Sequence, residues 1–175
     1  AKKVAIEFHS YSKTAGFTGI RCGYTIIPKE LTATTKDGKC VEVAQYWDRR
    51  QCTKFNGTSY ISQRAAEAIY SSEGKKQIKQ TINYYMENAR IIRESLTDLG
   101  LTVYGGQNAP YLWVKTPADT PSWKFFEEML NGAQVVCTPG VGFGLAGEGF
   151  IRITSFGDRN DCIEAIARIK KWLNK

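Results

Sequence analysis

One lysine lies in a segment whose other residues suit a phosphate group. The segment "SYSKTAGFTGIR" places Ser10 and Ser12 beside Lys13, with Arg21 eight residues after the lysine. Lysine attacks carbonyl compounds when its surroundings lower its pKa, which is about 10.4 in a peptide. Hydroxyl groups and the guanidinium fork bind phosphate oxygens. The segment therefore indicates a site for a phosphorylated aldehyde; the alternative is a polar loop with a solvated lysine.

A second candidate is Arg152, which interrupts the apolar segment "GFIRITSF" at 149–156. Burying a lone guanidinium is costly unless it meets an anion. One interpretation is a bidentate clamp on a substrate carboxylate. The alternatives are an internal salt bridge and an edge strand that leaves Arg152 exposed, and the residues alone do not choose among the three.

The segment "GVGFGLAGEGF" contains the spacing G-x-G-x-x-G at Gly142, Gly144 and Gly147. In dinucleotide-binding proteins this motif leaves a strand and opens a helix. Here a strand is predicted to follow, at 149–156, which argues against a dinucleotide site. We expect instead a loop whose backbone passes close to a ligand or to another part of the protein.

Short elements are predicted around the Lys13 segment. Alternating and apolar residues predict strands at 4–8 and 22–28, followed by a loop at 29–39 with a turn at Asp37 and Gly38. Helices are predicted at 43–50 and 60–70. Asn56 and Gly57, between these helices, indicate a turn first and a ligand contact second.

The strongest helical pattern covers 75–99, and Gly100 follows at the position of a C-cap. Beyond it the order is strand, strand, helix, strand, strand, helix. The strands are expected at 101–105, 111–115, 133–139 and 149–156, and the last helix at 160–173. In the other helix, capped by Thr120, we expect Trp123, Phe126 and Leu130 to face the core. This order predicts an α+β lobe with helices on one face of a mainly antiparallel sheet.

Composition narrows the class of protein. The 175 residues suit one domain or two small ones, and no apolar run is long enough to span a membrane. The net charge of +7 comes from dispersed lysines and arginines, which favours solvated helix faces over a nucleic-acid surface. Five widely spaced cysteines and a single histidine argue against a disulfide framework, a metal site and a Ser-His-Asp triad. A reducing, cytoplasmic location is expected.

Taken together, these segments resemble a known family. "SYSKTAGFTGIRCGY" resembles the S-x-S-K-x-x-G-x-x-G-x-R signature of the class I/II, fold-type I aminotransferases, which use pyridoxal 5′-phosphate, and "GFIRITSF" is similar to their C-terminal strand. The resemblance extends over essentially the whole chain. It implies an α/β fold comprising the end of the large cofactor-binding domain (1–74), a linking helix (75–99) and a small α+β domain (100–175).

The resemblance also implies roles for single residues. Lys13 would be the catalytic lysine that holds the cofactor, and Arg152 would bind the substrate carboxylate. Asn56 would approach the cofactor and the substrate across the interface of a homodimer. The cofactor-binding residues would be Ser10, Ser12, Lys13, Arg21 and Asn56.

The segments "CTKFNGTSYISQ" and "YGGQNAPYLWVK" resemble a more specific group of enzymes than the family signature does. This resemblance implies transfer of an amino group from LL-2,6-diaminopimelate to 2-oxoglutarate, giving tetrahydrodipicolinate and glutamate in lysine biosynthesis. The family's N-terminal half has no counterpart here, so we expect a C-terminal portion that is inactive alone. The alternatives are another fold-type I enzyme, such as a different aminotransferase or a C–S lyase, and a non-enzymatic basic binding module. No metal, nucleic-acid partner or membrane is expected.

Overall fold

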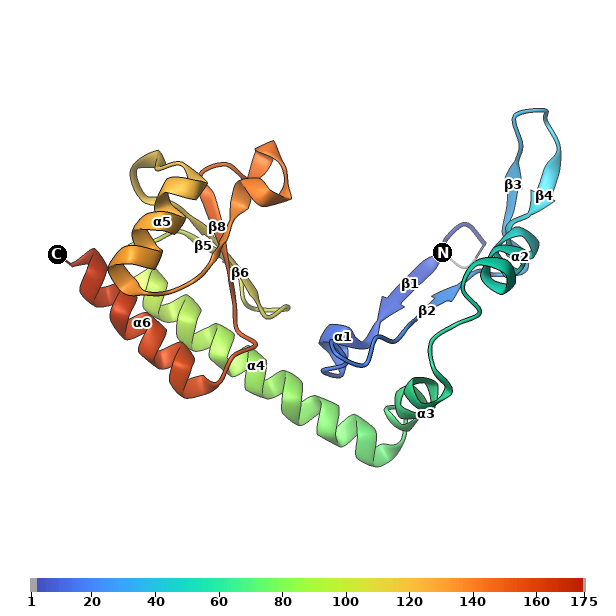
Figure 1. Ribbon diagram of the computed structural model, residues 1–175, viewed down its shortest axis with the longest axis horizontal. Helices are drawn as coiled ribbons and strands as arrows, with labels where there is room; N and C mark the ends of the chain where they lie inside the picture. The colour runs from blue at the N-terminus through green and yellow to red at the C-terminus, as the bar shows by residue number, and fades with distance from the viewer. Residues whose placement is uncertain (1–2, 175) are drawn as a thin grey trace. The chain divides into compact units, whose positions relative to one another are not determined.

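A computed structural model describes residues 3–174 of the chain. The chain divides into two compact units, Ala1–Thr81 and Ile82–Lys175, which we call unit 1 and unit 2. The division falls inside the long helix α4 (Ser72–Asp98), where the periodic pattern predicts a helix at 75–99 (Figure 1). Each unit is described by itself.

In unit 1, strand β1 (Glu7–Ser10) pairs antiparallel with β2 (Gly23–Ile26). The register joins Glu7 to Ile26 and Ser10 to Gly23. β1 therefore begins later than the strand predicted at 4–8. Extending this register backwards would bring Ala5 opposite Pro28, and proline has no N–H to donate to a ladder. The pairing places the start of helix α1 (Tyr11–Thr14) directly at the end of β1.

The loop predicted at 29–39 is wrong in part, because it contains the first strand of a hairpin as well as the predicted turn. Strands β3 (Thr32–Thr34) and β4 (Cys40–Glu42) pair antiparallel around Asp37 and Gly38, and Gly38 has φ +82°. Asp-Gly is a favoured pair at the turn of a hairpin. Helices α2 (Val43–Lys54) and α3 (Tyr60–Ala68) follow, close to their predicted positions.

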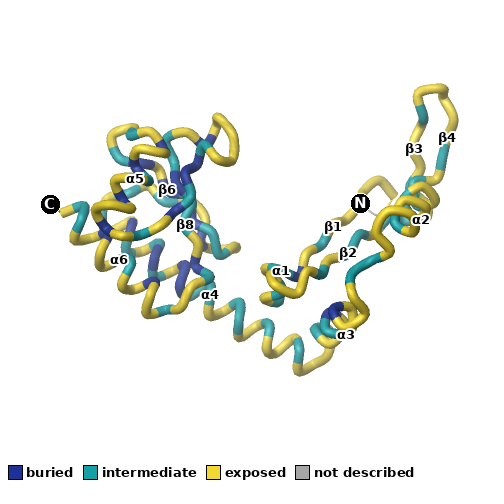
Figure 2. Tube along the Cα trace, viewed as in Figure 1, coloured by how far each residue is buried: buried dark blue, intermediate teal, exposed yellow. Residues whose placement is uncertain are grey.

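Unit 1 buries few apolar side chains of its own. Among the residues of unit 1 that the structure describes, Tyr11, Ser62 and Ala66 are buried, and exposed positions dominate the strands and helices (Figure 2). Phe8 and Ile61 are 69% and 82% exposed. Since burial of apolar area supplies most folding free energy, unit 1 gains less from its own core than unit 2 does.

Unit 2 contains a four-stranded sheet in the order β5-β6-β8-β7, with every pair antiparallel. The strands are β5 (Val103–Gly105), β6 (Tyr111–Lys115), β7 (Thr138–Pro139) and β8 (Phe150–Thr154). Helices α5 (Ser122–Ala133) and α6 (Arg159–Leu173) alternate with the strands in the expected order. Short 3₁₀ turns occupy Pro117–Asp119, Gly140–Phe143 and Leu145–Gly147.

The core of unit 2 lies between the helices and one face of this sheet. Leu112, Val114 and Ile151 are fully buried, whereas the residues alternating with them are more exposed. The helices contribute Ala89, Ile92 and Leu96 from α4, Phe125, Met129 and Ala133 from α5, and Cys162, Ile166 and Ile169 from α6. Helices therefore cover one face only, and the other face carries Tyr111, Trp113 and Arg152.

The inward face predicted for α5 is wrong. Trp123 and Leu130 are exposed and Phe126 is half-buried, while Phe125, Met129 and Ala133 are buried. Both sets recur every three or four residues, because this helix has adjacent apolar residues on two faces. Periodicity alone does not choose between stripes one residue apart.

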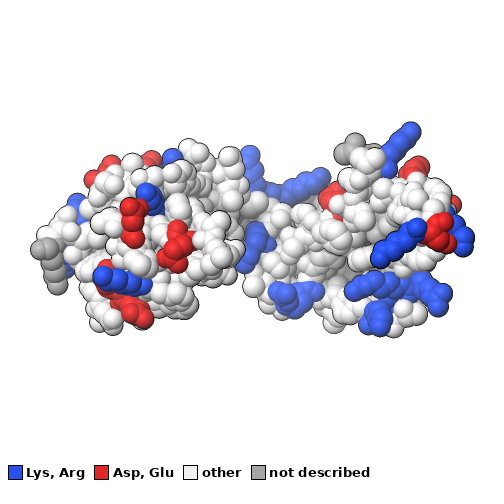
Figure 3. Space-filling model, turned by 90° about the horizontal axis from the view of Figure 1, so that it is seen from above, with Lys and Arg blue, Asp and Glu red and all other residues white. Residues whose placement is uncertain are grey.

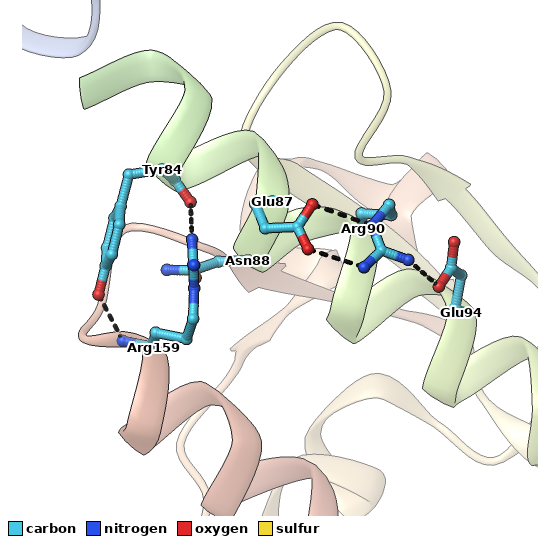
Figure 4. Close-up of polar contacts among 6 residues, drawn as sticks. All are labelled: Tyr84, Glu87, Asn88, Arg90, Glu94 and Arg159. Atoms are coloured by element: carbon cyan, nitrogen blue, oxygen red, sulfur yellow. Dashed lines mark hydrogen bonds and ion pairs between the residues drawn. The ribbon is translucent and has the colours of Figure 1, made fainter. Parts of the chain in front are cut away.

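Asn88 of α4 lies beside Arg159 of α6 (Figure 4), and its buried amide ties α4 to the segment that follows β8. Asn88 is fully buried, and its Nδ2 donates to the carbonyl oxygens of Ser155 (3.2 Å) and Gly157 (3.0 Å). Its Oδ1 accepts from Nε of Arg159 at 3.0 Å, and the guanidinium of Arg159 lies 4.5 Å from the ring centre of Tyr84. The amide thus satisfies two carbonyls directly after the strand that carries Arg152.

Replacing Asn88 with leucine is expected to lower the free energy of unfolding of unit 2 by about 2–4 kcal/mol, because it leaves buried carbonyl groups without donors. Urea titration followed by a signal from unit 2, such as the NMR signal of the Trp113 indole N–H, measures the change. Asn83→Leu, at an exposed position of the same helix, is the control. Equal midpoints for the two variants would contradict the assigned role.

Candidate active-site residues

Three of the candidate residues are brought together where β1 passes into α1. Ser10 is the N-cap of α1, and its Oγ accepts from the backbone N–H of Ser12 at 3.2 Å. Lys13 lies in the same helical turn and is exposed. The backbone N–H of Tyr11 donates to the carbonyl of Cys22, which fixes the turn to β2. The amine and two hydroxyl groups therefore share one short, anchored turn.

Arg21 is linked back to this turn through Thr18. The Thr18 hydroxyl donates to the carbonyl of Ser12 (3.1 Å), and Nη1 of Arg21 donates to the carbonyl of Thr18 (2.7 Å). Arg21 also has φ +63°, in the left-handed region that side-chain-bearing residues seldom occupy. Such strain persists where the surroundings enforce it and is concentrated at functional sites. Thr18 escaped the sequence reasoning because a threonine in a polar loop carries no motif.

Asn56 lies in a segment that is hydrogen-bonded to the Arg21 turn. Asn56 has φ +68°, which asparagine tolerates better than most residues. The Thr58 hydroxyl donates to the carbonyl of Arg21 at 2.9 Å, and the Ser62 hydroxyl donates to the carbonyl of Ile20 at 3.3 Å. Thr58 thus connects the two candidate segments across 37 residues of sequence.

Tyr11 is a residue of this site that the sequence reasoning missed. It lies between the two serines, is buried, and its hydroxyl is 2.8 Å from that of Tyr70, which follows α3. Both tyrosines line a cleft with Tyr24, Asn56 and Thr58. Burial, and then the hydrogen bond with Tyr70, raise the pKa of Tyr11 well above its usual range. Tyr11 therefore stays protonated at neutral pH and anchors the lysine turn to α3.

Arg152 lies in unit 2, on the sheet face that the helices leave uncovered. β8 is an interior strand, with Trp113 of β6 and Thr138 of β7 opposite Arg152, so the edge-strand interpretation is wrong. None of the ion pairs found within residues 3–174 includes Arg152, so these residues supply no salt bridge to it. In the same range the buried Nε atoms of Arg152 and Arg93 lack hydrogen-bond partners. The carboxylate clamp stays a prediction, and the donor without a partner is compatible with it.

The glycine-rich segment makes a close backbone approach, but to itself. A Cβ atom on Gly147 would collide with the carbonyl oxygen of Gly140, and one on Gly140 would collide with that of Gly147. The two glycines therefore pinch the base of a loop whose tip carries Phe143 and Leu145. The dinucleotide motif is only apparent, since β8 follows the loop instead of a helix.

Glu148 anchors this loop to the N-terminus of α5, where sequence predicted capping by Thr120. Its Oε1 accepts from the N–H of Ser122 at 2.6 Å and from that of Gly149 at 3.2 Å. The hydrogen bond from Ser122, followed by that from Gly149, lowers the pKa of Glu148. The carboxylate also faces the positive end of the helix dipole. Thr120 instead donates to the carbonyl of Pro117.

Glu148→Gln is expected to lower the Tm by a few degrees at neutral pH. A depressed native pKa means that the stabilisation by Glu148 is complete above the unfolded value, about 4.3, and is lost as pH falls through the native pKa. The difference in Tm between the parent and the variant should therefore shrink below pH 4. Thermal unfolding followed by circular dichroism between pH 3 and 7 measures it. Glu127→Gln, exposed on α5, is the control; a difference independent of pH would refute the carboxylate's role.

Three properties of the described residues bear on other functions. Lysine and arginine side chains are present on both units with acidic side chains among them (Figure 3). Within the described part of the chain, no group of three or more His, Cys, Asp or Glu side chains could hold a metal ion. No helix among these residues has the length and apolar character needed to cross a membrane.

Known proteins resemble the chain along its whole length. The sequence model of the family described as aminotransferase class I and II matches residues 1–169. A relative from Bacteroides thetaiotaomicron named LL-diaminopimelate aminotransferase is 69% identical over 99% of this chain. One of the same name from Parabacteroides distasonis is 66% identical. The chain spans 42% of the length of each of these relatives.

A solved structure gives the same result for the fold. L,L-diaminopimelate aminotransferase from Chlamydomonas reinhardtii is 45% identical and matches 98% of this chain with a TM-score of 0.89, over 41% of its own length. The expected fold class, the C-terminal part of an α/β fold-type I aminotransferase, is therefore confirmed.

Proposed function

Because the chain belongs to the class I and II aminotransferase family, we propose that the intact protein transfers an amino group from LL-2,6-diaminopimelate to 2-oxoglutarate. The products are tetrahydrodipicolinate, formed as the oxo product cyclises, and glutamate. The observation that carries the proposal is that relatives named LL-diaminopimelate aminotransferase are 61–69% identical to this chain over 99% of its length. The reaction serves lysine biosynthesis in the cytoplasm.

The donor set around Lys13 fits pyridoxal 5′-phosphate, the cofactor of this family. An exposed amine, the hydroxyls of Ser10 and Ser12 and the guanidinium of Arg21 lie in twelve residues that Thr18 holds together. In the proposal Lys13 holds the aldehyde, and Ser12 and Arg21 bind the phosphate. When bound, the cofactor withdraws electrons from the substrate α-carbon; the protein supplies orientation and electrostatics.

Lys13 moves the proton in this scheme. Its Nζ takes a proton from the α-carbon of diaminopimelate as a general base, and in the second half-reaction it returns one to carbon 2 of the former 2-oxoglutarate. The anchoring of its turn by Tyr11 and Ser10 limits where the amine can reach. Such positioning lowers the entropic part of the barrier.

Arg152 binds the α-carboxylate of the substrate through two parallel N–H···O bonds. Its Nε lacks a partner among the described residues, so an incoming carboxylate would satisfy a donor that is already shielded from water. In the proposal, Asn56 binds the cofactor and the substrate across the interface of a homodimer.

A substrate panel tests the proposal on the intact protein that contains this chain. Diaminopimelate, aspartate, aromatic amino acids and cystathionine are assayed with 2-oxoglutarate, and glutamate and pyruvate are measured. Preference for diaminopimelate supports the proposal. Preference for another amino acid, or pyruvate from cystathionine, would assign a different enzyme of the same fold. A salt-dependent nucleic-acid titration tests the binding-module alternative.

A further inference from the structure

On the sheet face of unit 2 that no helix covers, aromatic rings lie against the guanidinium group of Arg152. Arg152 lies opposite Trp113, and Tyr111 lies two residues before Trp113 on the same side of β6. The guanidinium carbon of Arg152 is 4.9 Å from the ring centre of Tyr111 and 4.6 Å from that of Phe143. Two uncharged rings thus contact the guanidinium group of Arg152.

Phe143 is the ring that β6 and β8 do not supply, because it comes from the glycine-rich loop. Its ring also meets Trp113 edge-on, with centres 5.7 Å apart, and 54% of its surface is exposed. An aromatic residue with that exposure gains little from burial alone. The contacts of the Phe143 ring with Trp113 and with the guanidinium of Arg152 therefore need another explanation.

The loop is built to hold Phe143 in place. Gly140 and Gly147 pinch its base, and Glu148 fixes its end to α5 through the N–H of Ser122. Gly144 has φ +117°, a conformation that glycine adopts without strain. The loop thus leaves the edge strand β7, reaches the uncovered face with Phe143 and returns to β8.

We propose that Phe143 is a positioning residue for Arg152. Its ring and that of Tyr111 hold the guanidinium by cation–π contact and leave the N–H groups available to a carboxylate. An arginine side chain loses up to about 2 kcal/mol of rotamer entropy when it is fixed. A guanidinium that is already held loses less on binding, so the carboxylate binds more tightly. The inference rests on the proposed role of Arg152 in binding a carboxylate. It assigns to the glycine-rich loop the role of holding Phe143 against Arg152.

The first readout does not depend on ligand. In the ¹⁵N-arginine-labelled 175-residue chain, the Nε–H signal of Arg152 is assigned as the one missing from Arg152→Lys, and its exchange with water is measured. Phe143→Leu, which keeps an apolar side chain, is expected to speed this exchange by about two- to fivefold. Phe143→Tyr should restore the parent rate. Leu145→Ala, 89% exposed on the same loop, is the control and should leave it unchanged.

The second readout is titration with glutarate, a dicarboxylate probe. The parent should shift the Arg152 signal on binding, and Phe143→Leu should weaken binding by about two- to fivefold. If glutarate leaves the Arg152 signal unmoved both in the parent chain and in the intact protein that contains it, the proposed carboxylate role fails, and the exchange rates alone decide whether Phe143 restrains Arg152. If Phe143→Leu keeps the parent exchange rate, or matches the parent in glutarate affinity where the parent binds, the inference is overturned.

Discussion

Replacing Lys13 with alanine in the intact protein is expected to abolish transamination, with kcat reduced by about 10²–10⁴-fold or more. The variant loses both the amine that holds the cofactor and the group that moves the α-proton. No other candidate in the Ser10–Arg21 segment can replace it, because the segment contains no second lysine. The rate of glutamate formation, with mass spectrometry as the detection method, measures the loss of activity.

Controls separate this role from general damage. Lys29→Ala, an exposed lysine just after β2, should retain the parent rate. Incubation of the parent with pyridoxal 5′-phosphate and borohydride should place a reduced adduct on Lys13, and Lys13→Ala should lose that adduct. Appreciable turnover by Lys13→Ala, or an adduct spread over many lysines, would contradict the assignment.

The lysine turn was predictable because its signal is local. Ser10, Ser12, Lys13 and Arg21 occupy twelve consecutive residues, and backbone hydrogen bonds within a short turn keep them together. The long helix was predictable for a similar reason, since a periodic pattern that covers 75–99 leaves little ambiguity about its type.

The contacts that orient these residues were not predictable, because they join distant parts of the sequence. Thr58 reaches Arg21 across 37 residues, and Tyr70 reaches Tyr11 across 59. Arg152 shows the limit most clearly. The sequence placed a cation in an apolar strand, but only the strand order, with β8 between β6 and β7, excludes an exposed edge.

Ambiguity of pattern explains the remaining errors. The face of α5 was misplaced because apolar residues adjoin one another along that helix, and its N-terminus is capped by Glu148, 26 residues away. Strand β3 of the hairpin falls within the loop predicted at 29–39, because the polar residues there gave no strand pattern beside the Asp-Gly turn. In both places tertiary contacts decide between local alternatives of similar free energy.

Replacing Arg152 with lysine is expected to raise KM for diaminopimelate by about 10- to 100-fold, with a smaller effect on kcat. Lysine keeps the charge but loses the planar fork, and its ammonium group makes no parallel pair of hydrogen bonds with a carboxylate. Initial rates over a range of diaminopimelate concentrations, with 2-oxoglutarate fixed at saturation, give both constants.

The choice of control decides how the Arg152 result is interpreted. Arg168→Lys changes an exposed arginine that pairs with Glu164 on α6, and it should leave KM unchanged. Because Arg152 lacks an ion-pair partner among the described residues, its replacement should also cost less stability than the loss of a buried salt bridge would. A raised KM with an unchanged Tm therefore indicates a binding role. An unchanged KM would show that the carboxylate is held elsewhere, and the aromatic rings around Arg152 would then stabilise unit 2 without serving the reaction.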